Sequence, residues 1–186
     1  MNKKHERELT VAKFEDIDRF PHCNYKIDVA LDFLLDHIKF WEEDFVLELN
    51  PDFQRGHVWE YSQQVKYIEY ILMKPQKGPS TSLIFNCTNW DCYSNIPEEN
   101  IIQCVDGLQR ITALTGFLKN NIPAYGRLLN DYEDQRYLKS VYVQFYVNSL
   151  PTRADVLKYY IQLNSGGTVH TSEEIERVKK TTEKGD

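Results

Sequence analysis

The stretch VDGLQR at residues 105–110 constrains the fold more than any other part of this chain. The apolar segment 101–105 is expected to form a strand, and it runs directly into Asp106-Gly107, a pair typical of turns. A helix is expected over 108–120, because apolar residues recur there at three- and four-residue spacing. The face expected to be buried consists of Leu108, Ile111, Leu114, Thr115 and Leu118. A strand, a tight turn and a helix N-terminus in succession form a recurrent phosphate-binding arrangement.

Gln109 and Arg110 lie in the first turn of this helix and outside its apolar face. The positive end of the helix dipole disfavours a cation unless an anion lies nearby. Two interpretations of Arg110 stay open: contact with a bound phosphate, or a salt bridge back to Asp106 four residues earlier. Asp106 is likewise either a functional carboxylate or only the N-cap of the helix, since Asp is a favoured cap.

A second polar cluster is NPDFQRGHVW at residues 50–59. Asn-Pro and the glycine are turn formers, and Phe53, Val58 and Trp59 are expected to be buried anchors. These anchors would hold Gln54 and Arg55 rigidly between them. Arginine suits bidentate contact with phosphate. The alternative is an ordinary surface arginine in a loop.

A third cluster is NSGGT at residues 164–168. The adjacent Gly166 and Gly167 can be simply a helix C-cap and a turn. They can also let backbone N–H groups approach an anion closely, as in anion-binding nests. For His57 and His170 the sequence contains no metal partner at a suitable spacing, so structural or solvated roles are expected.

Composition limits the function classes. With 186 residues the chain is long enough for one domain with its own core. A net charge of −6 argues against a broad electrostatic grip on duplex nucleic acid, but not against a local phosphate pocket. No apolar run has the length of a membrane span, and residues 1–10 lack the apolar stretch of a signal peptide, so a cytoplasmic protein with no membrane contact is expected. The cysteines lack zinc-finger spacing and are expected to be reduced thiols; they are Cys23, Cys87, Cys92 and Cys104.

Periodicity and capping residues indicate the remaining elements. Thr171 and Glu174 have capping-box spacing for a final helix. The other expected elements are a helix over 27–41, a strand over 45–49, a helix over 62–73 with Ser62 as N-cap, strands over 82–88 and 141–147, and a helix over 152–163 with Thr152 as cap. This mixed order favours an α+β domain with one small sheet.

The three clusters, in this order, resemble the N-terminal domain of GmrSD-type modification-dependent restriction enzymes. The resemblance rests on PDFQRGHVW, VDGLQRITAL and LNSGGT, and it spans roughly residues 25–178. It implies a ParB/sulfiredoxin-like α+β domain with a small mixed sheet flanked by helices. A 1–24 extension would precede this domain, and a polar tail at 179–186 would follow it. The family is widespread in bacterial and phage defence, so the resemblance implies the cytoplasm of a bacterium, or of its host if the chain is phage-encoded.

The resemblance also implies roles for particular residues. Asp106 would be the catalytic acid or the carboxylate that holds a divalent cation such as Mg²⁺, with Gly107, Gln109 and Arg110 beside the phosphates of a nucleoside triphosphate. Arg55, with Gln54, would face the same pocket. The residues implied for its far wall are Asn164, Gly166 and Gly167.

The chain departs from the family pattern in two ways. Leu108 stands where the family's Asp-Gly-Gln-Gln-Arg motif has its first glutamine, and helical spacing suggests that this position faces the core. The chain also ends at residue 186, where family members continue into a helical region and often an HNH-type nuclease domain. A short stand-alone member or a fragment is therefore expected.

Three functions remain as hypotheses. The first is a metal-dependent phosphohydrolase acting on a nucleoside triphosphate. The second is a nucleotide-sensing module without turnover that signals to a separate nuclease or defence protein. The third is a ParB-like DNA nuclease, which the acidic net charge disfavours because bulk electrostatics would not hold DNA.

Overall fold

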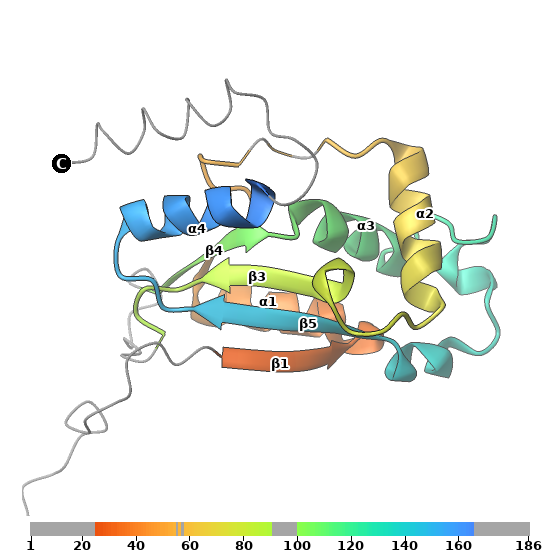
Figure 1. Cartoon of the computed structure of the whole chain (residues 1–186). Helices are drawn as coiled ribbons and strands as arrows, with labels where there is room; N and C mark the ends of the chain where they lie inside the picture. Colours follow the sequence, from red (N-terminus) through yellow and green to blue (C-terminus); the bar gives the residue numbers. More distant parts are fainter. Residues whose placement is uncertain (1–24, 55, 57, 91–99, 166–186) are drawn as a thin grey trace, which may run out of the picture.

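The computed structural model describes residues 25–54, 56, 58–90 and 100–165, which form one α+β domain (Figure 1). Its centre is a mixed sheet with the strand order β1-β5-β3-β4-β2. The strands are β1 (Tyr25–Ala30), β2 (Val46–Glu48), β3 (Ser82–Asn86), β4 (Ile101–Asp106) and β5 (Tyr142–Asn148). The β1/β5 and β3/β4 pairs are antiparallel, whereas β3/β5 and β2/β4 are parallel. The expectation of an α+β domain with a small mixed sheet flanked by helices is confirmed.

Helices cover both faces of this sheet. In Figure 1, α1 lies behind β3 and β5, and α4 runs alongside β4. The helices are α1 (Leu34–Asp44), α2 (Tyr61–Leu72), α3 (Leu108–Leu118) and α4 (Arg153–Ser165), with short 3-10 turns η2 (Leu31–Phe33), η3 (Pro79–Thr81), η5 (Leu129–Asp131) and η6 (Gln135–Ser140). None of these described helices is long and apolar enough to span a lipid bilayer.

The main core lies between one face of the sheet and α1, α2 and α3. Trp41 of α1 is at its centre, with ring centroids 4.8 Å from Phe85 and 5.2 Å from Phe145, both in edge-on geometry. Phe85 and Phe145 stack on each other across the parallel β3/β5 pair at 5.5 Å. Aromatic pairs in these geometries stabilise a core beyond the area they bury.

A second, smaller core lies on the opposite face of the sheet. Successive residues of a strand point to opposite faces, so Cys104 enters the main core and Val105 enters the second. The buried members of the second core are Phe53, Val105, Val156, Leu157 and Tyr160. This cluster attaches α4 and the chain around residue 53 to β4.

The predicted helix over 27–41 is wrong in its first part. Residues 27–30 belong to β1, which pairs with β5 through Ile27↔Phe145 and Val29↔Val143. Apolar residues at 27, 31, 34 and 38 fit a helical period, but 25, 27 and 29 also fit a strand, and pairing with β5 decides between them. The helical part of the prediction is confirmed by the buried Leu34, Ile38 and Trp41 of α1.

The predicted cap of the second helix is also wrong. Glu60, and not Ser62, is the N-cap of α2, and its backbone N–H donates to Gln63 Oε1 at 2.8 Å in a capping box. Thr152 does cap α4, because the Asp155 N–H donates to its Oγ1 at 3.2 Å. The other predicted strands and helices are confirmed with ends displaced by one or two residues.

Several expectations fall outside the described residues: the 1–24 extension, the 179–186 tail and the Thr171/Glu174 capping box. The same holds for His57, His170, Cys23 and Cys92. Cys87 and Cys104 are free, buried thiols, as the cysteine spacing predicts.

Candidate functional site

The site begins where β4 meets α3. β4 ends at Asp106, Gly107 is the N-cap residue, and α3 begins at Leu108, so the predicted strand, turn and helix N-terminus are present. Gly107 has φ of 116°, in the left-handed region that favours glycine. A Cβ added to it would lie 2.8 Å from Leu83 Cδ2. The turn therefore depends on glycine for its conformation and for its close packing against β3.

Asp106 is the last residue of β4, and no side chain caps α3 through a hydrogen bond. The alternative in which Asp106 serves only as the helix N-cap is therefore wrong. The Asp106 side chain is 37% exposed at the edge of the turn.

Leu108 is buried in the main core, with 7% of its surface exposed. The inference from helical spacing that this position faces the core is confirmed. A glutamine here would put an amide among apolar side chains, where a polar group without a partner is costly. Leucine at this position thus takes part in packing.

Gln109 fastens the second polar cluster to α3. Its Oε1 accepts hydrogen bonds from the backbone N–H groups of Val58 (2.9 Å) and Trp59 (3.0 Å). Its Nε2 donates to the carbonyl oxygen of Gly56 at 2.7 Å. One amide group therefore satisfies three backbone groups of a segment about fifty residues earlier in the chain.

Gln54 makes a second connection between the same two clusters. Its Nε2 donates to the carbonyl oxygen of Cys104 in β4 at 2.7 Å, two residues before Asp106. Arg55 lies outside the described residues, but its chain neighbours Gln54 and Gly56 are both bonded to residues 104–109. Phe53 is a buried anchor as expected, whereas Val58 is 46% exposed, contrary to expectation.

Arg110 forms the salt bridge to Asp106 that was one of the two interpretations of this residue. The same guanidinium donates to the carbonyl oxygen of Pro79 in η3. The Arg110 guanidinium bonds to polar groups outside the apolar core, as expected from its position on α3, but only 14% of the side chain is exposed because η3 contacts it.

Tyr67 of α2 lies next to this ion pair. Its hydroxyl donates to the carbonyl oxygen of Ser80 at 3.0 Å. Burial raises the pKa of Tyr67, the Asp106 carboxylate raises it further, and the Arg110 guanidinium opposes that rise. Tyr67 is therefore a neutral hydrogen-bond donor that holds η3 in place.

Burial raises the pKa of the Cys104 thiol to about 12, and the nearby Asp106 charge adds to the effect. The reactive form of cysteine is the thiolate. Cys104 therefore stays protonated and inert, although it lies only two residues from Asp106.

Of the third cluster, the structure describes the start, at the C-terminal end of α4. Tyr160 packs edge-on against Phe53 with ring centroids 5.3 Å apart, and Arg153 forms an ion pair with Asp52 at 2.6 Å. Asn164 uses its amide within its own helix, donating to the carbonyl oxygen of Tyr160 at 2.8 Å. Gly166 and Gly167 lie outside the described residues.

The second core therefore joins the first two polar clusters to α4, the helix that leads into the third. Phe53 precedes Gln54, Val105 precedes Asp106, and Tyr160 is one helical turn before Asn164. The structure brings the 54–59 segment and the β4–α3 turn together through hydrogen bonds, whereas the Asn164 amide bonds within its own helix. No signal in the sequence indicated Tyr67 or the contact of Arg110 with Pro79, because these depend on a loop that no motif marks.

In the described part of the chain, no group of three or more His, Cys, Asp or Glu residues could hold a metal ion. Mg²⁺ sites with one or two carboxylates usually complete their coordination with substrate phosphates and water, so Asp106 alone does not make a metal site.

Comparison with known proteins identifies a family. A family model described as "GmrSD restriction endonuclease, N-terminal domain" matches residues 34–178. Searches of curated proteins and of solved structures gave no significant match.

Proposed function

Because the chain belongs to the GmrSD restriction endonuclease N-terminal domain family, we propose that it binds a nucleoside triphosphate with Mg²⁺ at the β4–α3 turn and hydrolyses it. The family associates the chain with DNA restriction and phage defence. One observation carries the finer proposal: Asp106 and Arg110 lie in contact beside Gly107, at a helix N-terminus to which the segment 54–59 is fastened by hydrogen bonds.

The helix N-terminus supports phosphate binding. The first N–H groups of a helix lack intrahelical partners and point toward a ligand in front of it. Gly107 has no side chain to keep that ligand at a distance. Arg110 uses one N–H donor for Asp106 and one for Pro79. A guanidinium has five N–H donors, so these two bonds do not use all of them.

In the proposed reaction, water attacks the terminal phosphorus, the bond to the bridging oxygen breaks, and a nucleoside diphosphate and phosphate leave. Mg²⁺ would supply charge neutralisation at the phosphates. Asp106 would hold the ion, and Arg110 would turn from Asp106 toward the phosphoryl oxygens. Electrostatic stabilisation of this kind is the main contribution of a protein to phosphoryl transfer.

A nucleotide sensor without turnover is the second candidate. The observation that favours it is that Asp106 and Arg110 are already paired and that most of the Arg110 side chain is buried. Turnover requires Asp106 and Arg110 to separate from each other. Binding of a nucleotide in front of α3 requires only the N–H groups at the helix N-terminus. The sensor would pass its nucleotide-bound state to a separate nuclease or defence protein.

Phosphate release and thermal stability, measured with Mg²⁺ and each common nucleoside triphosphate, test the proposal. We expect Asp106→Asn and Arg110→Lys to lower turnover about a hundred- to a thousandfold. The matched control is Glu43→Gln, which removes a carboxylate from the exposed i,i+4 pair with Lys39. It should leave turnover unchanged.

The outcomes separate the candidates. A rise in Tm with nucleotide but no phosphate release supports the sensor, because a ligand that binds only the native state stabilises it. Equal turnover in wild type and both site variants, at matched folding, contradicts the hydrolase. Plasmid nicking that is lost in Asp106→Asn would instead support the nuclease.

A further inference from the structure

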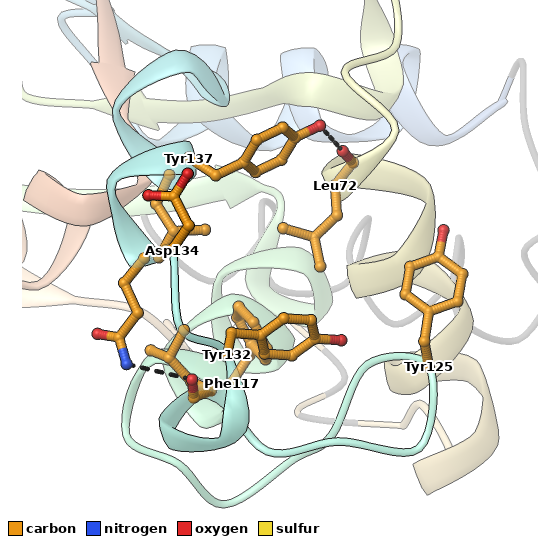
Figure 2. A pocket seen from close by; sticks show the side chains of 9 residues that line it. Leu72, Phe117, Tyr125, Tyr132, Asp134 and Tyr137 are labelled. Atoms are coloured by element: carbon orange, nitrogen blue, oxygen red, sulfur yellow. Dashed lines mark hydrogen bonds between the residues drawn. The ribbon is translucent and has the colours of Figure 1, made fainter.

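A second candidate site lies at the other ends of α2 and α3. A cavity of about 370 Å³ lies between Leu72, the last residue of α2, Phe117 near the end of α3, and the segment 125–138 (Figure 2). Trp59 immediately precedes α2, and Gln109 lies in the first turn of α3. The hydrogen bond between them lies near the β4–α3 turn, at the N-terminal ends of both helices. The cavity is therefore separate from the site proposed for nucleotide.

The cavity walls are mainly apolar and aromatic. The apolar and aromatic side chains that line it are Leu72, Phe117, Tyr125, Leu129, Tyr132, Tyr137 and Leu138. Each tyrosine hydroxyl donates to a backbone carbonyl: Tyr125 to Glu69 (3.2 Å), Tyr132 to Ala124 (2.7 Å) and Tyr137 to Leu72 (2.7 Å). These bonds satisfy the polar ends of the tyrosines and hold the rings in position as walls.

The backbone at Tyr125 shows that this wall is held in place. Tyr125 has φ of 48°, a left-handed conformation that is uncommon for a bulky residue. The side chain of Glu69 accepts a hydrogen bond from the Tyr125 N–H at 2.8 Å, in addition to the bond from the hydroxyl. Strained conformations persist where the surroundings over-determine them, and they cluster at functional sites.

One carboxylate, that of Asp134, lines the cavity. Of the described residues that line it, Asp134 alone is charged, and its side chain is 75% exposed, so the carboxylate lies at the mouth. Arg136 Nε lies 3.8 Å from Asp134 Oδ1, but both side chains are exposed and such a pair contributes little. An incoming ammonium group can replace Arg136 as the partner of Asp134. Lys74 Nζ already lies 4.2 Å from the ring centroid of Tyr137, so the aromatic rim accommodates a cation.

We propose that this cavity binds a small aromatic molecule with a positively charged amine. An apolar cavity of about 150 Å³ can hold benzene, so a volume more than twice as large suits two fused rings. The rings would lie among Phe117, Tyr132 and Leu129. The ammonium group would lie at the mouth beside Asp134.

Titration of the full chain with three probes, followed by NMR, tests the proposal. Tryptamine carries the positive charge, indole is neutral, and indole-3-acetate is negative. We expect affinity to fall in that order, with the largest shifts at residues that line the cavity. Asp134→Asn should weaken tryptamine about two- to fivefold, the range of an exposed ion pair, and leave indole unchanged. Glu133→Gln removes a neighbouring exposed carboxylate that does not line the cavity, and it should change neither probe.

Three results would overturn the proposal: no shift with any probe, shifts confined to the β4–α3 turn, or indole-3-acetate binding as tightly as tryptamine. None of these depends on nucleotide binding or turnover, so the two sites can fail independently.

Discussion

At the start of α3, three consecutive side chains make unrelated contacts. Leu108 packs in the main core, Gln109 holds the backbone of residues 56–59, and Arg110 pairs with Asp106 and the carbonyl of Pro79. Helical geometry separates successive side chains by about 100°, so neighbours in sequence face different surroundings. Periodicity alone predicted the burial of Leu108. Spacing also allowed the salt bridge of Arg110 with Asp106, but it could not predict the partners of Gln109 or the contact of Arg110 with Pro79, because these lie about fifty and thirty residues away.

Gly107 gives the first stability prediction. Gly107→Ala places a Cβ 2.8 Å from Leu83 Cδ2 and 3.2 Å from Leu83 Cα, at φ of 116°. Since the backbone of Leu83 belongs to β3 and cannot move freely, we expect a loss of about 1–3 kcal/mol in the free energy of unfolding. Urea denaturation measures it.

Gly78→Ala is the matched control, because a Cβ there meets nothing within 4 Å and the backbone is extended. A Gly107→Ala variant as stable as Gly78→Ala would show that the turn does not require glycine.

Among the elements, those with a single periodicity were predictable and those with two competing patterns were not. The alternation in β5 and the spacing in α3 each fit one structure, and both elements are present. The 25–34 segment fits both a strand and a helix, and only its pairing with β5 decides. The N-cap of α2 was missed because Ser62 is a better cap by residue type, whereas Glu60 gains a reciprocal bond with Gln63.

The connection between α3 and the segment 56–59 gives a prediction at the element scale. Gln109→Ala removes three hydrogen bonds to Gly56, Val58 and Trp59. A partly exposed bond contributes about 0.5–1.5 kcal/mol, so we expect local destabilisation of about 2 kcal/mol. Amide exchange at Val58 and Trp59 should accelerate roughly thirtyfold, since 1.4 kcal/mol is a factor of ten.

Gln135→Ala is the control, because its amide makes one bond, to Leu129 O at 3.2 Å, far from this segment. Unchanged exchange at Val58 and Trp59 in Gln109→Ala would mean that other contacts hold the segment.

For the whole molecule, the two cores on opposite faces of one sheet explain how distant polar motifs come together. The order of elements predicted the α+β class, and hydrogen bonds join the 54–59 segment to the β4–α3 turn. The second core was not predictable, since Phe53, Val105 and Tyr160 lie on three elements and share no pattern in the sequence. The cover that η3 forms over Arg110 was not predictable for the same reason.

The packing of α1 on the sheet gives a prediction about acid stability. His37 lies between Trp41 and Phe145, with ring centroids 4.9 and 4.7 Å away, and burial lowers the pKa of its imidazole. Its buried Nε2 has no hydrogen-bond partner in the described structure. Below the ordinary histidine pKa, near 6.5, the unfolded chain takes up a proton that the folded chain resists. The stabilising contribution of neutral His37 is therefore complete above this pH and declines as the pH falls toward the folded pKa.

His37→Phe keeps a ring between Trp41 and Phe145 and removes the titrating group. We expect wild type to lose more Tm than this variant when the pH is lowered from 7.5 to 5.5, because carboxylates titrate in both proteins and cancel in the comparison. Parallel Tm curves for the two proteins would show that His37 takes up its proton without opening the core between α1 and β5.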